Sequence, residues 1–273
     1  MNRNSSSNLF TALYSLIRGT GIFRTSLGRR AFISSYFLYK RNWEDPFWLL
    51  AQTHPELFRG GHILDIGANV GYTACLFAQL ADPRCQVFAF EPDAENFALL
   101  ADVIQRKKLA NRVVPIQSAV GSSEGHIQFW HNEAHSGDHR VITEQFAATV
   151  PDAAQISAVP LTSVDAFASS RNLGKVAFIK IDVQGYEPVV CQGMKRTICD
   201  SPDVCVCCEY APHAMIDLGF QAAELLEFFR SGGFQIYILD RSSLTLASDH
   251  AEIQRLAAHF GYVDLLCLRK PLK

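Results

Sequence analysis

From residue 60 onward, short apolar runs bounded by turn residues alternate with helix-like segments, and this alternation restricts the fold more than any other feature. It is typical of parallel strands joined by right-handed helical crossovers. The predicted strands are residues 62–66, 86–90, 113–117, 127–130, 176–181, 204–208, 234–239 and 262–268. The predicted helices include residues 72–80, 94–108 and 221–231. We therefore predict an α/β fold with a doubly wound, mostly parallel sheet.

Size and composition indicate one catalytic domain with a short appendage. The 273 residues are 48% hydrophobic and 19% charged, which is enough to bury a core without disulfides or a metal. A net charge of -2 gives no electrostatic reason to expect nucleic-acid binding, so we expect a small-molecule or glycan partner. The eight cysteines lack the spacing of a disulfide framework, and no stretch resembles a cleaved secretory signal. These features predict a cytoplasmic protein.

The N-terminal segment is basic and amphipathic. Residues 1–43 contain Arg and Lys but neither Asp nor Glu, and apolar residues recur at helical spacing over residues 9–17 and 32–37. We interpret residues 1–58 as a helical extension or cap and residues 59–273 as the catalytic domain. Peripheral contact of the basic helices with a membrane surface is the alternative role for this segment.

A glycine-rich turn follows the first predicted strand. In the segment from Leu64 to Tyr72, Gly67 and Gly71 allow a ligand to approach the backbone closely where the strand turns into a helix. Asp65 suits an ammonium group and would repel a pyrophosphate. The spacing D-x-G-x-x-x-G also lacks the middle glycine of a dinucleotide fingerprint, which disfavours NAD.

A carboxylate follows the second predicted strand. Glu91 comes twenty residues after Gly71, at the end of the apolar run 87–90, where a carboxylate can accept hydrogen bonds from both ribose hydroxyls. The turn and this carboxylate together predict an adenosine-containing ligand. We assign cofactor binding to Asp65, Gly67, Asn69, Gly71, Glu91 and Ser118.

The chain resembles the FkbM family of S-adenosylmethionine-dependent O-methyltransferases. The resemblance covers about residues 60–240 and rests on LDIGANVGYTA (64–74), FAFEPDAENFALL (88–100), VPLTSVDAF (159–167) and FIKIDVQGYEPVVCQGM (178–194). It implies a class I methyltransferase (Rossmann-like) fold, S-adenosyl-L-methionine as cofactor, and a site at the end of the fourth strand. It leaves the acceptor open among hydroxyls of sugars, glycans and natural products. The family often has Glu where this chain has Gln184.

Two further carboxylates fall at strand ends. Lys180 and Asp182 share one face of the fourth strand, where they either pair with each other or contribute to a site. We predict that Asp182 orients the acceptor or helps to remove its proton. Glu209 follows the fifth strand and is a second catalytic candidate, with capping of the next helix as the alternative. A divalent metal held by Asp182, Glu209 and a histidine is conceivable, but we assign no metal ligands.

Three histidines, at positions 131, 135 and 139, are spaced by four residues in the irregular, polar stretch 131–159. Gly137 favours a loop there over a metal-binding helix. His135 is the first candidate for a general base, because a neutral imidazole titrates near pH 7. We expect this stretch to form part of the substrate site. Cys205, Cys207 and Cys208 lack the C-x-x-C spacing of a zinc site.

Methyl transfer to a hydroxyl oxygen is the function that these features favour. A nicotinamide-dependent oxidoreductase or epimerase would share the fold and the ribose carboxylate, but it needs a pyrophosphate site. A non-catalytic adapter that binds a partner through the basic N-terminal helices is the alternative outside catalysis. Cofactor binding distinguishes the three.

Overall fold

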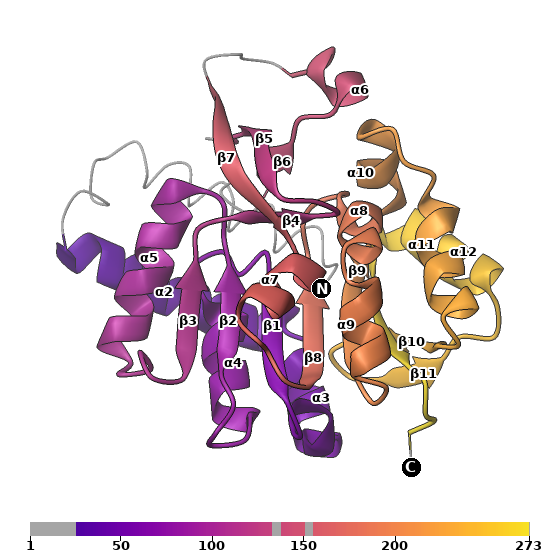
Figure 1. The fold of residues 1–273 in the computed structure, drawn as a ribbon, viewed down its shortest axis with the longest axis horizontal. Helices are drawn as coiled ribbons and strands as arrows, with labels where there is room; N and C mark the ends of the chain where they lie inside the picture. The colour runs from indigo at the N-terminus through magenta and orange to yellow at the C-terminus, as the bar shows by residue number, and fades with distance from the viewer. Residues whose placement is uncertain (1–25, 133–137, 151–154, 273) are drawn as a thin grey trace.

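The computed structural model describes residues 26–132, 138–150 and 155–272. Its centre is an eight-stranded sheet in the order β11-β10-β12-β9-β8-β1-β2-β3, with helices on its faces (Figure 1). The parallel strands are β1, β2, β3, β8 and β9. By contrast, β12 is antiparallel to both β9 and β10. The order reverses between β1 and β8, which makes this a doubly wound sheet with a switch point beside β1. The predicted fold class is confirmed.

The strands of the central sheet are β1 (His62–Ile66), β2 (Val87–Phe90), β3 (Val113–Ile116), β8 (Val176–Ile181), β9 (Cys205–Tyr210), β10 (Gln235–Leu239), β11 (Leu244–Leu246) and β12 (Val263–Leu268). Six of the strands predicted from the sequence agree with them within one residue at each end. Residues 204–208 differ more, because β9 continues to Tyr210 and therefore contains Glu209. β2 and β8, in the parallel part of the sheet, are buried at every position and are mostly apolar, as parallel strands are.

The helices are α2 (Ser26–Tyr39), α3 (Phe47–Thr53), α4 (Tyr72–Leu80), α5 (Ala94–Arg106), α6 (Glu144–Ala147), α7 (Val164–Ser170), α8 (Glu187–Gln192), α9 (Lys195–Asp200), α10 (Pro212–Asp217), α11 (Ala222–Ser231) and α12 (His250–Phe260). A π-helical turn, η2 (Lys40–Glu44), continues α2, and a 3-10 turn, η3 (Pro55–Phe58), precedes β1. Apolar spacing predicts α4 with its observed bounds and α5 and α11 to within two residues. The apolar positions 32–37 are helical in α2, whereas residues 9–17 lie outside the described residues.

A second, four-stranded sheet stands beyond the carboxyl ends of the central strands (Figure 1). It comprises β4 (Ala119–Gly121), β5 (Gly125–Trp130), β6 (Arg140–Val141) and β7 (Ile156–Ser163). The irregular stretch predicted over residues 131–159 is wrong in part, because β6, α6 and the start of β7 fall within it. β5 and β7 pair along six residues, and this long-range pairing supplies order that local composition does not reveal.

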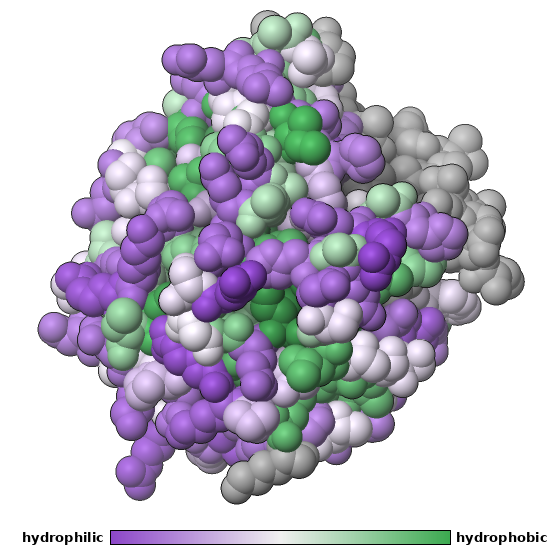
Figure 2. Space-filling view, turned by 90° about the vertical axis from the view of Figure 1, so that its right-hand side faces the viewer, coloured by the Kyte–Doolittle hydropathy of each residue, from purple (hydrophilic) through white to green (hydrophobic). Residues whose placement is uncertain are grey.

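The molecular surface over α10, α11 and α12 is mostly polar, with apolar residues interspersed (Figure 2). Isolated exposed apolar side chains such as Ile216 and Phe260 are normal for a folded domain and need no partner. In the described part of the chain, the helices are too short or too polar to cross a bilayer.

Candidate functional site

A cavity of about 720 Å³ opens at the carboxyl ends of the parallel strands, beside the switch point of the sheet. Its walls come from the segments that follow β1, β2, β3, β8 and β9, from α2 and η2 on the N-terminal side, and from β6 of the second sheet. Open α/β sheets bind ligands at this place, because the crossover helices leave in opposite directions from neighbouring strands. The cavity is therefore the candidate active site.

The glycine turn after β1 forms one wall. Gly67 has a φ of 78°, and a Cβ built on it would lie 1.8 Å from the carbonyl oxygen of Asp182. Gly71 has a φ of 87° and begins α4. Asn69, with a φ of 48°, points its backbone N–H at Glu91 Oε2, 2.8 Å away. At Gly67 the backbone of the turn therefore packs directly against the backbone of Asp182, and no side chain fits there.

Asp65 lies beneath this turn and is fully buried. Its Oδ2 accepts a hydrogen bond from Thr73 Oγ1 at 2.7 Å, and Lys180 Nζ lies 3.6 Å from Oδ1. Burial raises the pKa of this carboxyl above its usual value, although the charge of Lys180 opposes the shift. Because Asp65 is not on the cavity wall, any effect on a bound cofactor passes through Lys180 and the turn.

Glu91 lines the cavity beside the turn, directly after β2. Its two oxygens accept backbone N–H groups, Oε2 from Asn69 and Oε1 from Asp93 at 2.9 Å. Burial raises the pKa of Glu91 to about 8 despite these two hydrogen bonds. The carboxyl is held rigidly at the position that the sequence predicts for a ribose contact.

Lys180 and Asp182, at the end of β8, are paired and also line the cavity. Lys180 Nζ lies 3.3 Å from Asp182 Oδ2 and donates to the carbonyl oxygen of Gly67 at 2.8 Å. Burial opposes ionisation of Asp182, but the charges of Lys180 and Lys40 outweigh it and hold its pKa below the usual value. Asp182 is therefore an anion at neutral pH, facing the space in which a positively charged group would be favoured.

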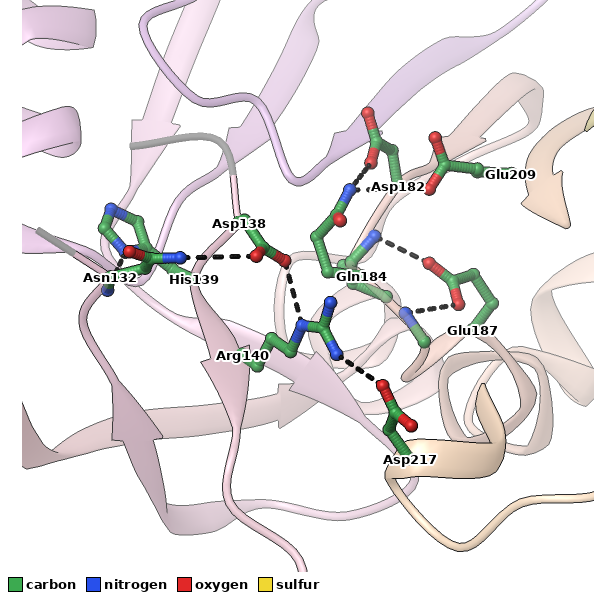
Figure 3. A network of polar contacts seen from close by, with 11 residues as sticks. Asn132, Asp138, His139, Arg140, Asp182, Gln184, Glu187, Glu209 and Asp217 are labelled. Atoms are coloured by element: carbon green, nitrogen blue, oxygen red, sulfur yellow. Dashed lines mark hydrogen bonds and ion pairs between the residues drawn. The ribbon is translucent and has the colours of Figure 1, made fainter. Parts of the chain in front are cut away.

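Gln184 bridges the two carboxylates at the ends of β8 and β9 (Figure 3). Its Nε2 donates to Asp182 Oδ1 at 3.0 Å and lies 3.4 Å from Glu209 Oε1. Gln184 has a φ of 55°, and the buried Glu187 holds the turn by accepting the N–H groups of Val183 and Gly185. A neutral amide at position 184 can donate to both acids at once, which a carboxylate could not do.

The N-cap of α10 is Ala211 and has no side-chain hydrogen bond, so the helix-capping alternative for Glu209 is wrong. β9 runs two residues farther than predicted, but Glu209, its second-last residue, still lies near the carboxyl end of the strand and lines the cavity. Burial and the nearby charge of Asp182 raise its pKa well above the usual value. A raised pKa favours the neutral form of Glu209, and a neutral carboxyl can donate a hydrogen bond as well as accept one.

The N-terminal segment contributes side chains that sequence reasoning missed. Tyr36, Lys40 and Glu44 line the cavity, and Lys40 forms a 2.5 Å ion pair with Glu44. Asp45 also lies there and accepts a hydrogen bond from the hydroxyl of Tyr72 at 2.6 Å. The basic, amphipathic pattern indicates a cap but not which residues face the site.

The 131–141 stretch takes part in the cavity through Asp138, His139, Arg140 and Val141. Arg140 joins Asp138 at 2.9 Å and Asp217 of α10 at 3.2 Å, and so connects the second sheet to the main domain (Figure 3). His135 lies outside the described residues.

Ser118 is buried on the cavity wall, and its hydroxyl lies 3.0 Å from the carbonyl oxygen of Pro160.

Comparison with known proteins identifies the family. The model of the FkbM methyltransferase domain matches residues 65–236. A hexuronic acid methyltransferase, AglP, from Haloferax volcanii is 30% identical over 135 residues, which are 49% of this chain and 50% of that protein. The aligned part thus spans half the length of this relative.

Two solved structures are similar at low sequence identity. The methyltransferase FkbM from Methylobacillus flagellatus is 16% identical, with 76% of this chain and 43% of that chain covered and a TM-score of 0.46. The O-methyltransferase from Bacillus cereus, solved with S-adenosylhomocysteine, is 11% identical, with 81% and 79% covered and a TM-score of 0.44. The domain match takes in the glycine turn, Glu91, Asp182 and Glu209 together, and on that match this chain belongs to the FkbM methyltransferase family.

Proposed function

We propose that this protein transfers the methyl group of S-adenosylmethionine to a hydroxyl oxygen of a sugar, a glycan or a natural product. One observation carries the proposal. In a chain of the FkbM family, the rigid Glu91 carboxyl and the anionic Asp182 face the same cavity across a turn that admits no side chain at Gly67. When bound, S-adenosylmethionine supplies an activated methyl group on a sulfonium.

The donor side of the cavity is formed by the turn and Glu91. Glu91 accepts hydrogen bonds from the ribose hydroxyls, and the backbone of residues 67–71 approaches the methionine part closely. Gly67, Asn69 and Gly71 contact the cofactor through their backbone. Asp65 acts indirectly, because its carboxyl holds Lys180 beneath the turn. Ser118 closes the wall after β3, where the adenine would lie.

The acceptor side is formed by Asp182, Gln184 and Glu209. Asp182 orients the acceptor hydroxyl toward the methyl group, and its negative charge stabilises the sulfonium. Its lowered pKa makes it a weak base, so alignment is its larger contribution, and well-oriented reactants gain about 7–11 kcal/mol. Glu209, whose raised pKa favours the neutral carboxyl, is the second carboxyl that contacts the acceptor. His135 remains our candidate for the base that removes the hydroxyl proton.

The name of the AglP relative, a hexuronic acid methyltransferase, suggests the first acceptors to screen. We propose to compare two classes of acceptor. One class is uronic acids and glycans that contain them, and the other is neutral hexoses. Release of S-adenosylhomocysteine in the presence of each acceptor measures turnover directly.

Calorimetric binding of S-adenosylmethionine, S-adenosylhomocysteine and NAD tests the donor side. We expect micromolar binding of the first two and none of NAD. Because Glu91 would accept two hydrogen bonds as an anion, Glu91→Ala should weaken binding about 10- to 100-fold. The exposed Glu227→Gln is the control. Binding of NAD alone would favour the oxidoreductase hypothesis, and failure to bind any of the three would favour the adapter.

Cofactor affinity should rise with pH. Glu91 accepts ribose hydroxyls best when ionised, but with a pKa of about 8 it is mostly protonated at pH 7 in the cofactor-free protein. If only the ionised form binds, the Kd for S-adenosylhomocysteine should fall about tenfold between pH 7 and pH 9. Glu91→Gln, which cannot titrate, should remove this dependence. A flat profile in the unsubstituted protein would contradict a ribose contact at Glu91.

A further inference from the structure

Three side chains that could bind a metal converge outside the catalytic carboxylates, where the second sheet meets α5. Asp93 precedes α5, His131 follows β5, and His139 precedes β6. One donor atom from each lies within 4.8 Å of the other two. The residues come from the N-cap of α5 and from the segments beside β5 and β6, and they are up to 46 positions apart (139 minus 93), so the fold and not local spacing brings them together.

The Asp93 carboxylate divides its two oxygens between two tasks. Oδ1 accepts the N–H of Asn96 and caps α5, whereas Oδ2 faces both imidazoles. The distance from Oδ2 to His131 Nδ1 is 2.6 Å, and that to His139 Nε2 is 3.9 Å. The Asp93 and His139 side chains are only 7% and 11% exposed, and the two rings pack 5.9 Å apart. Three donors are thus held around one point, with His131, at 25% exposed, on the side that faces solvent.

We propose that Asp93, His131 and His139 bind a divalent transition-metal ion such as Zn²⁺. Two imidazoles and one carboxylate form a ligand set that suits zinc and leaves a position for water or a further ligand. The ion clamps the β5–β6 hairpin onto the start of α5.

The contacts around the cluster partly prepare it for an ion. His131 Nε2 lies 2.6 Å from Ser157 Oγ, so when Nδ1 coordinates the ion, the Nε2 proton is donated to this hydroxyl. A hydrogen bond of this kind commonly fixes the tautomer of a metal-bound histidine. The oxygen that caps α5 is the one not used for the ion, so helix capping and coordination do not compete.

Two changes accompany coordination. His131 Nδ1 and Asp93 Oδ2 must separate from 2.6 Å, since two ligands of one ion lie farther apart than a hydrogen-bonded pair. The N–H of Asn132 donates to His139 Nδ1 at 2.8 Å, and this contact is lost when the ring proton moves to Nδ1. One exchanged hydrogen bond contributes far less than metal coordination.

The clamp has a consequence for the active site. His139 lines the cavity, and the backbone N–H of Asp93 donates to Glu91 Oε1. An ion at this place therefore fixes the position of His139 in the cavity wall. It also supports the Glu91 carboxyl, because the backbone of Asp93 holds that carboxyl. The ion lies beside the cavity, since only His139 of its three ligands lines it.

The test is calorimetric titration of the metal-free full chain with ZnCl₂, followed by metal analysis after dialysis. We expect one equivalent of Zn²⁺ with micromolar or tighter affinity and a rise in Tm. His131→Gln, His139→Gln and Asp93→Asn should each weaken binding by more than about 100-fold, since second-sphere changes alone reach that size. Asn retains the helix cap, so Asp93→Asn should fold. His126→Gln, at an exposed histidine on β5, is the matched control and should bind normally.

Titration with Co²⁺ provides a second measurement, because the visible absorption of the bound ion reports its ligands. Loss of the absorption band in each of the three variants, and its retention in His126→Gln, supports the proposal. Absence of Zn²⁺ binding in the unsubstituted protein overturns it, as does binding that survives all three substitutions. Neither measurement needs the methyl donor or an acceptor, so the result is independent of the proposed function.

Discussion

Replacing Gly67 with alanine will abolish binding of S-adenosylmethionine and destabilise the domain. The new Cβ would lie 1.8 Å from the carbonyl oxygen of Asp182, a backbone atom that cannot move without displacing the end of β8. The φ of 78° adds strain of about 1–2 kcal/mol for a residue with a side chain. Overpacking against backbone costs a further ~1–3 kcal/mol or more, so the free energy of unfolding should fall by several kcal/mol.

Gly60→Ala is the matched control for this substitution. Gly60 has a φ of 89°, close to that of Gly67, but a Cβ at this position would meet nothing within 4 Å. The variant should therefore show the strain of the left-handed backbone alone, a loss of about 1–2 kcal/mol, with cofactor binding intact. Urea unfolding and calorimetry on both variants separate the two effects. Equal losses in the two variants would mean that the contact between Gly67 and β8 has no special importance.

The segments that form the proposed donor side can be predicted from the sequence because their signals are local. The first strand, the glycine turn and the helix after it form one continuous segment, and their observed bounds match the prediction. Glu91 can be identified for the same reason, since a short, fully apolar strand ends immediately before it. The carboxyl ends of parallel strands meet at one edge of the sheet, so the turn and Glu91 line the same cavity.

The acceptor side can be predicted only in part, because it depends on contacts between distant segments. β7 pairs with β5 across more than 25 residues, and that pairing orders a stretch whose composition indicates a loop. Lys40 reaches the site from the N-terminal segment through tertiary packing. Periodicity identifies an amphipathic helix but not the element that its face will meet. Asp93 and His139 illustrate the same limit, since neither residue suggests the other in the sequence.

Burial also changes the interpretation of residues that the sequence does identify. Residue type suggests that Asp65 meets the ammonium of the cofactor, but it is buried beneath the turn and contacts Thr73 and Lys180 instead. Glu209 is identified as a carboxylate near the end of the fifth strand, but burial and the nearby Asp182 raise its pKa well above the usual value. A sequence gives the charge that a side chain carries in water, whereas the fold decides whether that charge persists.

Replacing Asp182 with asparagine should weaken S-adenosylmethionine binding and leave S-adenosylhomocysteine binding nearly unchanged. The two ligands differ by the positive charge on sulfur, and the lowered pKa of Asp182 keeps this carboxylate ionised on the cavity wall. Unit charges about 4 Å apart interact with ~1 kcal/mol in water and ~4 kcal/mol near a protein surface. The preference for the sulfonium should therefore fall by about tenfold or more. Lys180 keeps Asp65 and the carbonyl of Gly67 as partners, so the fold should persist.

With an acceptor from the screen, Asp182→Asn should also lower kcat by about 100-fold, because a misaligned hydroxyl loses most of the benefit of orientation. The exposed Glu227→Gln removes one carboxylate from α11 and should change neither measurement. An equal loss of affinity for S-adenosylmethionine and S-adenosylhomocysteine would indicate a structural role for Asp182. An unchanged ratio together with an unchanged kcat would remove Asp182 from the site, and Glu209, the carboxyl bridged to it by Gln184, would then be the next acceptor-orienting candidate to test.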